Sequence, residues 1–199
     1  MTAGMLAMIL AMGMTACANA DTKEKSTTKK EQVSESDEKK EQKMSDNEAN
    51  VMNEKFNTLK TQGNYNNHIG VPLTIFRLKN EDALTIEMGM NHSGEISTLT
   101  KIAKPTVCVI TNIGTAHIGN LGSRENILKS KLEILEGMQK KEIIINCDND
   151  LLDEWNKENL NKGELKIHCF GFENRGEVWA DNIILEENSS EFNCHVVLN

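Results

Sequence analysis

The sequence predicts an α/β domain built on a mostly parallel sheet. Short apolar runs alternate with segments of helical periodicity, and polar residues follow directly after the runs. The carboxyl ends of parallel strands meet at one edge of a sheet, where α/β proteins bind their ligands. We therefore expect a partial, mostly parallel sheet with flanking helices, and a functional site at the carboxyl edge of its strands.

The individual elements are predicted from apolar periodicity. Continuous apolar runs indicate buried strands, alternating runs near the end of the chain indicate an antiparallel pair, and apolar residues three or four apart indicate helices. Ser93 is expected to cap a helix that ends before Pro105. The expected strands cover residues 83–88, 107–111, 142–146, 166–170, 178–185 and 192–198, and the expected helices cover residues 93–104, 123–138 and a segment from 150.

Two amino-terminal segments differ in composition from the rest. Residues 1–20 are apolar and rich in Met and Ala, and small residues precede Cys17, as in the lipobox of a bacterial lipoprotein signal. No Lys or Arg precedes this apolar run, so an unstructured apolar terminus is an equal alternative. Residues 21–50 contain no Gly, Pro or aromatic residue and are expected to form a disordered charged linker. The folded domain is expected to cover residues 51–199.

Charge and cysteine content exclude some classes of protein. The net charge of −8, without a basic block, argues against a nucleic-acid-binding or acidic-membrane surface. Five cysteines without a C-x-x-C pair indicate neither a disulfide framework nor a zinc site. We expect Cys108, Cys147 and Cys169 to be buried strand thiols.

Candidate site residues follow the expected strands. Glu87 ends the first of them, and a carboxylate buried there needs a cation or hydrogen-bond donors. His117 lies on the loop after the second, and a carboxylate with an imidazole on adjacent strand ends is a plausible metal-binding pair. Asn64, Asn66 and Asn67 lie on a loop that is able to present amides to a ligand, although asparagines are also ordinary turn residues.

Several segments together resemble the central domain of the Mur ligases. They are TQGNYNNHIGVPLT, EMGMNHSGEI, VITNIGTAHI, LGSRENILKSKLEI and INCDND, and they occur in the order and at the spacing of that family. The resemblance covers about residues 54–199. It is strongest to the branch that adds D-alanyl-D-alanine to a UDP-muramoyl tripeptide.

The resemblance implies an ATP-dependent amide ligase of peptidoglycan precursor synthesis, acting in the cytoplasm through an acyl phosphate. It implies Glu87 and His117 as Mg²⁺ ligands, and Asn64, Asn66 and Asn67 as neighbours of the substrate and phosphates. Lys131 matches a family lysine whose side chain is carbamylated, although helix lysines are usually only solvated. Asn112, Asn146 and Asp148 are weaker candidates for secondary roles.

The sequence departs from the family in one important respect. The phosphate loop of the family, a G-x-x-G-K-T type of run, is missing, and residues 26–29 lack the glycines whose N–H groups cradle phosphate. We therefore expect a sheet without its first strand, with an open edge, and a fragment that is inactive alone. The alternative is a membrane-anchored lipoprotein, attached through Cys17, that carries a non-catalytic binding module.

Overall fold

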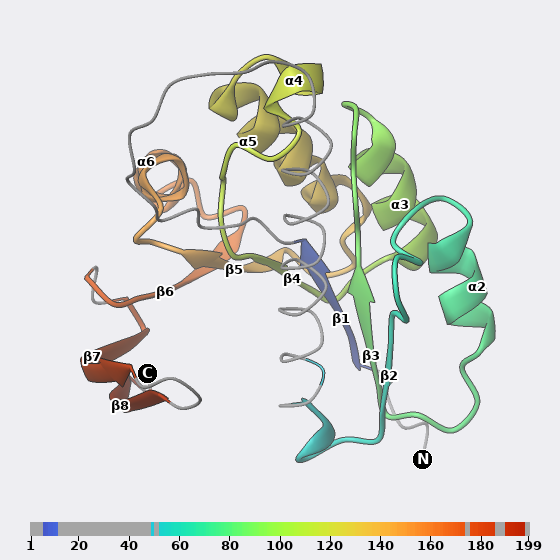
Figure 1. Cartoon of the computed structure of the whole chain (residues 1–199), viewed down its shortest axis with the longest axis horizontal. Helices are drawn as coiled ribbons and strands as arrows, with labels where there is room; N and C mark the ends of the chain where they lie inside the picture. Colours follow the sequence, from blue (N-terminus) through green and yellow to red (C-terminus); the bar gives the residue numbers. More distant parts are fainter. Residues whose placement is uncertain (1–5, 12–48, 50–51, 174–175, 186–189, 198–199) are drawn as a thin grey trace, which may run out of the picture.

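The structure, a computed structural model, is dominated by a twisted sheet (Figure 1). It describes residues 6–11, 49, 52–173, 176–185 and 190–197. In this part of the chain the sheet has eight strands in the order β2-β3-β1-β4-β5-β6-β7-β8. Neighbouring strands are parallel except β7 and β8, so the predicted mostly parallel α/β class is confirmed. The strands are β1 (Leu6–Ala11), β2 (Thr58–Lys60), β3 (Ala83–Glu87), β4 (Val107–Ile110), β5 (Glu142–Asn146), β6 (Lys166–Gly171), β7 (Val178–Leu185) and β8 (Ser190–Val196).

The helices connect successive strands and pack on the sheet. Figure 1 shows α3, α5 and α6 on one side of the sheet. Buried apolar residues of these helices belong to one core cluster with those of β3, β4 and β5. All five residues of β3 are buried, as a parallel strand between two neighbours requires. The helices are α2 (Gly70–Phe76), α3 (Glu95–Ala103), α4 (Ile118–Leu121), α5 (Arg124–Leu132), the 3₁₀ helix η1 (Glu133–Gly137) and α6 (Asp150–Asn159). The fully buried large side chains are Ile86, Ile96, Leu99, Ile110, Ile113, Ile127, Ile134, Ile143, Ile145 and Leu152.

The first strand of the sheet comes from the amino-terminal apolar segment, which corrects our expectation that this strand is missing. Leu6–Ala11 pairs in parallel with β3 on one side and with β4 on the other. A central strand of a parallel sheet needs a short continuous apolar run, and the core of a signal peptide has the same composition. Composition alone therefore does not distinguish the two. β1 occupies the place between β3 and β4, so the open edge expected from a missing strand is not present there. Of the predicted linker only Ala49 is among the described residues, and Cys17 lies outside them.

Two helix predictions also need correction. The long helix expected over residues 123–138 is divided into α5 and η1. Ser93 does not cap α3, since the capping position is Gly94, whose φ of 88° places it in the left-handed region and which offers no side-chain hydrogen bond. Residues 61–69, which carry Asn64, Asn66 and Asn67, form the loop between β2 and α2 and are called the asparagine loop below. The short helix α2 follows it, with Pro72 in its first turn, where the missing N–H costs nothing.

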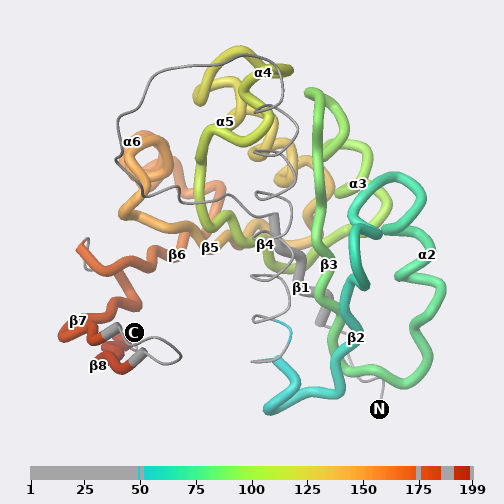
Figure 2. The backbone as a smooth tube through the Cα atoms, viewed as in Figure 1, coloured from blue at the N-terminus to red at the C-terminus, as the bar shows by residue number. Residues whose placement is uncertain are grey.

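The carboxyl-terminal strands form the far side of the sheet from β2. The backbone path in Figure 2 shows β7 and β8 folding back on each other beyond β6. Their antiparallel pairing confirms the prediction, and the register shifts between Asp181 and Ile184 mark an irregularity in it. No helix in the described part of the chain is long and apolar enough to cross a membrane.

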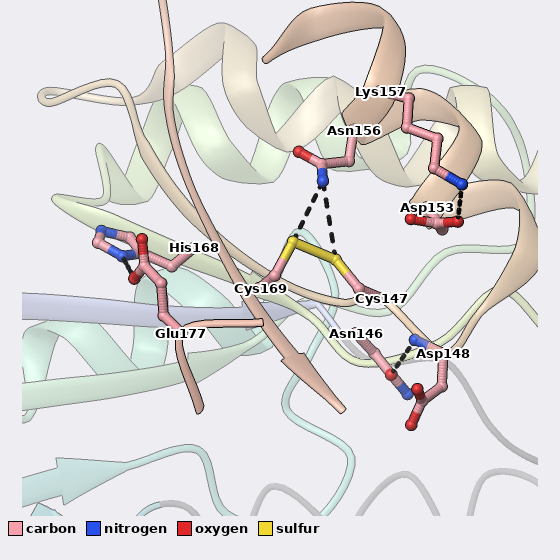
Figure 3. The surroundings of a disulfide bond; sticks show 9 residues. All are labelled: Asn146, Cys147, Asp148, Asp153, Asn156, Lys157, His168, Cys169 and Glu177. Atoms are coloured by element: carbon pink, nitrogen blue, oxygen red, sulfur yellow. Dashed lines mark hydrogen bonds and ion pairs between the residues drawn. A yellow bond between two sulfur atoms is a disulfide. The ribbon is translucent and has the colours of Figure 1, made fainter. Parts of the chain in front are cut away.

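Cys147 and Cys169 form a disulfide, so the prediction of two free thiols at these positions is wrong (Figure 3). Cys147 directly follows β5, and Cys169 of β6 is paired with Ile145 of β5. The pairing of these two parallel strands brings the Cα atoms of Cys147 and Cys169 to 5.6 Å. Asn156 of α6 donates a hydrogen bond to the Cys169 sulfur at 3.2 Å. Cys108 is a buried free thiol, as predicted, and burial raises its pKa to about 12.

The central place of β1 predicts the effect of an Ile9→Pro substitution. Ile9 is paired with Ile86 and Cys108 on its two sides, and proline removes a ladder donor and does not fit an interior strand. We expect Ile9→Pro to lower the free energy of unfolding by more than about 3 kcal/mol, while Ile9→Val costs less than about 1.5 kcal/mol. Urea denaturation followed by circular dichroism measures both. Equal midpoints for wild type and Ile9→Pro would place this segment outside the folded sheet.

Candidate functional site

A polar cavity of about 730 Å³ opens at the carboxyl end of β3. Its walls are the asparagine loop, the segment after β3, the first turns of α3, and His117 from the loop after β4. The main site residues predicted from sequence therefore meet here, with the exception of Lys131, and the weaker candidates Asn112, Asn146 and Asp148 do not line the cavity. The lining residues are Asn64, Asn66, Asn67, His68, Glu87, Gly89, Met90, Asn91, Ser93, Gly94, Glu95, Thr98, Leu99 and His117.

Glu87 is a nearly buried carboxylate at this edge, with only 3% of its surface exposed. Its backbone N–H donates to the Thr61 hydroxyl at 3.0 Å, which fixes the end of β3 against the asparagine loop. Its Oε1 accepts a hydrogen bond from the Asn66 side-chain amide at 2.8 Å. Hydrogen bonding is what makes burial of such a group tolerable, so the loop and the carboxylate stabilise each other.

The close approach of Asn66 to Glu87 depends on Gly89. The Gly89 N–H donates to the Asn66 carbonyl at 2.8 Å, which brings the two segments together. A Cβ atom on Gly89 would lie 2.8 Å from the Asn66 side chain, closer than real Cβ contacts come. Glycine at this position therefore leaves room for the Asn66 amide to reach Glu87.

The other two predicted asparagines line the same cavity but differ in their bonding. Asn67 Oδ1 accepts from the backbone N–H groups of Ile69 and Gly70, each at 3.0 Å, and so holds the loop against the start of α2. This is the turn chemistry that we weighed as the alternative for the asparagines. Asn64 is exposed, and it lines the cavity beside Asn66.

His117 lies at the start of α4 with left-handed backbone, at a φ of 63°. This conformation is uncommon for residues other than glycine, and it is often found at functional sites. Our expectation that Glu87 and His117 stand on adjacent strands is wrong, because β1 lies between β3 and β4. The loop after β4 nevertheless places His117 on the wall of the cavity that Glu87 lines.

Lys131 is buried in α5, with 7% of its surface exposed, and it is not among the lining residues of the cavity. Its ammonium donates to the Asn112 carbonyl at 3.4 Å, directly after β4. A buried lysine is unusual unless it is paired, so the solvated alternative does not hold for Lys131. The loop that carries His117 and the helix that carries Lys131 are thus joined through Asn112.

Two residues that sequence reasoning missed hold this loop in place. The Asn149 side chain donates to Asn112 Oδ1 at 2.6 Å and accepts from Leu152 N–H, which caps α6. Arg124 donates to the Ile113 carbonyl at 2.9 Å and pairs with Asp150. Hydrogen bonding to Asp150 raises the pKa of Arg124, and the same contact lowers the pKa of Asp150. The N-cap pattern of Asn149 was readable from sequence, but its long-range partner was not.

Asn146 and Asp148, two of the weaker candidates, do not line the cavity. They lie close to each other directly after β5 (Figure 3). Asn146 Oδ1 accepts from the Asp148 N–H at 2.9 Å. The Asp148 carboxylate accepts from the backbone N–H groups of Phe172 and Glu173 after β6. Their bonds therefore join the ends of β5 and β6.

No three His, Cys, Asp or Glu side chains of the described residues come together as a complete metal site. Glu87 and His117 place one carboxylate and one imidazole on the cavity wall. Mg²⁺ is usually held by one or two protein groups, with water and phosphate oxygens at its remaining positions. The donor set at this wall therefore fits a cation shared with a phosphorylated ligand, and it does not fit a closed structural metal site.

Comparison with known proteins places the chain in a family. A family model described as the Mur ligase middle domain matches residues 25–199. The chain belongs to the Mur ligase family. The match begins inside the segment predicted to be a linker, and the predicted boundaries at residues 20 and 50 stay predictions.

The Mur ligase relatives include curated proteins named UDP-N-acetylmuramoyl-tripeptide–D-alanyl-D-alanine ligase. The one from Bacillus subtilis is 45% identical over 96 residues, which are 48% of this chain and 21% of that protein. The one from Synechocystis is 40% identical over 140 residues, which are 69% of this chain and 31% of that protein. The aligned part of the chain thus spans less than a third of either relative.

Solved structures of Mur ligases share the fold. MurF from Acinetobacter baumannii superposes with a TM-score of 0.73 at 28% identity, over 98% of this chain and 37% of that protein. MurF from Thermotoga maritima, solved in complex with ADP, has a TM-score of 0.68 at 23% identity, over 96% of this chain and 38% of that protein. The latter comparison supports the fold alone.

A Gly89→Ala substitution tests the packing of this wall. The added Cβ atom occupies the place of the Asn66 side chain, so we expect loss of the Asn66–Glu87 hydrogen bond and about 1–3 kcal/mol of stability. The side-chain amide resonances of Asn66 in ¹⁵N-edited NMR spectra report the bond, and urea denaturation reports the stability.

Gly119→Ala is the matched control, since no atom lies within 4 Å of a Cβ atom built there. It should leave the Asn66 resonances in place. If Gly89→Ala also leaves them unchanged, Asn66 does not depend on Gly89 to reach Glu87.

Proposed function

We propose that the chain forms the nucleotide- and metal-binding middle part of an ATP-dependent ligase that joins D-alanyl-D-alanine to a UDP-muramoyl tripeptide. The names of the curated relatives support the substrates. The observation that carries the proposal is the meeting of Glu87, His117 and the asparagine loop in one cavity at the carboxyl edge of the sheet. The whole reaction belongs to a protein of the length of those relatives.

The chemistry of such a ligase explains why this donor set is needed. ATP phosphorylates the carboxylate of the muramoyl peptide, and the incoming amine then displaces phosphate from the acyl phosphate to form an amide. Both partners of the first step are anions, so their approach needs positive charge. Bound Mg²⁺ supplies that charge, and Glu87 and His117 are the residues that would hold it.

The remaining residues orient these ligands and the substrates. The Asn66 amide bonds one oxygen of Glu87 at 2.8 Å, which fixes the orientation of the carboxylate that would hold the cation. Asn64 and Asn67 line the same wall, where side-chain amides suit phosphate and peptide groups. The Lys131 ammonium bonds the Asn112 carbonyl. If it lost a proton and the amine then added CO₂ with release of a second proton, the side chain would become an anionic carbamate able to help hold Mg²⁺.

We also propose that this chain does not turn over alone. The sequence contains no glycine-rich G-x-x-G-K-T run, and backbone N–H groups of such a run are what cradle the nucleotide phosphates. With UDP-muramoyl tripeptide, D-alanyl-D-alanine and ATP, the purified chain should release no phosphate above background. Substrate-dependent phosphate release would contradict inactivity.

The proposed place of action is the cytoplasm, where ATP and UDP-linked precursors are available. The lipoprotein alternative requires the amino-terminal apolar segment to serve as an export signal. The same segment supplies β1, which pairs with β3 and β4 inside the sheet. One segment cannot be both an export signal and an interior strand of the sheet, so the proposal of a cytoplasmic ligase is better supported than that of a lipoprotein.

Titration with Mn²⁺, a paramagnetic substitute for Mg²⁺, tests the metal site. The electron paramagnetic resonance signal of free Mn²⁺ measures binding directly and needs no turnover. We expect one site in the wild type and at least about tenfold weaker binding in Glu87→Gln and in His117→Ala, because each variant loses a ligand.

Glu95→Gln is the matched control, because Glu95 lines the same cavity but its Oε2 is bound to the N–H groups of Asn91 and His92. Against the opposing effect of desolvation, these bonds hold the pKa of Glu95 below its ordinary value. Glu95→Gln should change Mn²⁺ affinity less than about twofold. Equal affinities for wild type, Glu87→Gln and His117→Ala would refute the proposed site.

A further inference from the structure

The amino-terminal turn of α3 forms part of the cavity wall but has no cap of its own. Its capping residue is Gly94, which carries no side chain to accept hydrogen bonds from the first turn. The first N–H groups of a helix have no partner within the helix and need one from elsewhere. With glycine as the capping residue, the first N–H groups of α3 need an acceptor from another part of the chain.

Glu133 of η1 supplies that acceptor from a distant part of the chain. Its Oε1 accepts from the Gly94 N–H at 2.8 Å and from the Ser93 hydroxyl at 3.0 Å. Its Oε2 accepts from the Gly94 N–H at 2.9 Å and from the Ser97 N–H at 3.1 Å. A carboxylate bound to N–H groups at a helix N-terminus benefits from both ionic hydrogen bonding and the helix dipole.

The turn that Glu133 holds separates two cavities. Ser93 lines the polar cavity with Glu87 and also a second cavity of about 330 Å³. The Ser130 hydroxyl of α5 lies 3.3 Å from the Ser93 hydroxyl, so both α5 and η1 contact Ser93. A shift of this turn would change the shape of both cavities.

We infer that Glu133 is a positioning residue, which clamps the α3 wall of the cavity onto the segment that carries Lys131. Glu133 follows Lys131 by two residues, at the junction of α5 and η1. The clamp therefore fixes the distance between the Lys131 segment and the wall that faces Glu87 and His117. This inference rests on the proposed function, since the site that it positions is the proposed metal site.

Glu136 offers a close comparison on the same element. It bonds the Ser97 hydroxyl and the Lys101 ammonium, each at 2.7 Å, so it also joins η1 to α3. Neither of those partners lines the cavity, and Glu136 bonds no backbone N–H of the first turn. Loss of Glu136 should weaken the packing of η1 on α3 without moving the cavity wall.

The test compares Glu133→Gln with Glu136→Gln in the full chain, using Mn²⁺ affinity and amide hydrogen exchange. Glutamine replaces one carboxylate oxygen by an NH₂ group. This group is a donor, so it cannot accept the hydrogen bond that the oxygen accepted. We expect faster exchange at the Gly94 and Ser97 amides and about threefold to tenfold weaker Mn²⁺ binding in Glu133→Gln. Glu136→Gln should match wild type in both measurements, and Glu133→Asp should recover part of the affinity.

The outcomes separate this inference from the proposed function. If wild type binds Mn²⁺ and Glu133→Gln binds it equally well, the positioning role is wrong even if the two amides exchange faster. Equal weakening by Glu136→Gln would also overturn it, because the effect would then be one of general packing. If wild type binds no Mn²⁺, the proposed metal site is wrong, and the positioning role fails with it.

Discussion

The hydrogen bond between Asn66 and Glu87 is the contact on which the cavity depends. It joins an exposed, asparagine-rich loop to the end of a fully buried strand. A carboxylate at that point needs a donor, and the loop needs a fixed point on the sheet. Gly89 permits both, since a larger residue would occupy the space of the Asn66 amide.

The rest of the site is connected to the sheet by side chains that cross between elements. Asn149 and Arg124 fix the loop after β4, Lys131 bonds its Asn112 carbonyl, and Glu133 fixes the turn before α3. These polar groups are bound mainly to backbone N–H and carbonyl groups, which fixes the loops more directly than contacts between flexible side chains would. Protein groups thus hold the cavity wall in place, as preorganised binding of charged groups requires.

The sequence allowed much of the sheet and the main site residues to be predicted, for a physical reason. The apolar runs of β3 to β6 have few alternatives once helical segments separate them, and parallel strands must direct Glu87 and the loop of His117 to one edge. The antiparallel pairing of β7 and β8 was predicted from the alternation of apolar and polar residues along the two segments.

The failures have physical reasons as well. The run that forms β1 has the composition of both a central strand and a signal peptide, so its neighbours decide its structure. The disulfide between Cys147 and Cys169 depends on the register of two strands, and the capping of Gly94 by Glu133 joins residues 39 apart. Such long-range pairs leave no local pattern in the sequence.

The most direct test of the account is a crystal structure of the chain grown with Mn²⁺, in which anomalous scattering locates the ion. We expect a peak at about 2.0–2.3 Å from a Glu87 carboxylate oxygen and a His117 ring nitrogen. Asn66 should remain bound to the other Glu87 oxygen. A fully occupied ion elsewhere, with Glu87 and His117 not in contact with it, would show that these residues do not form the metal site.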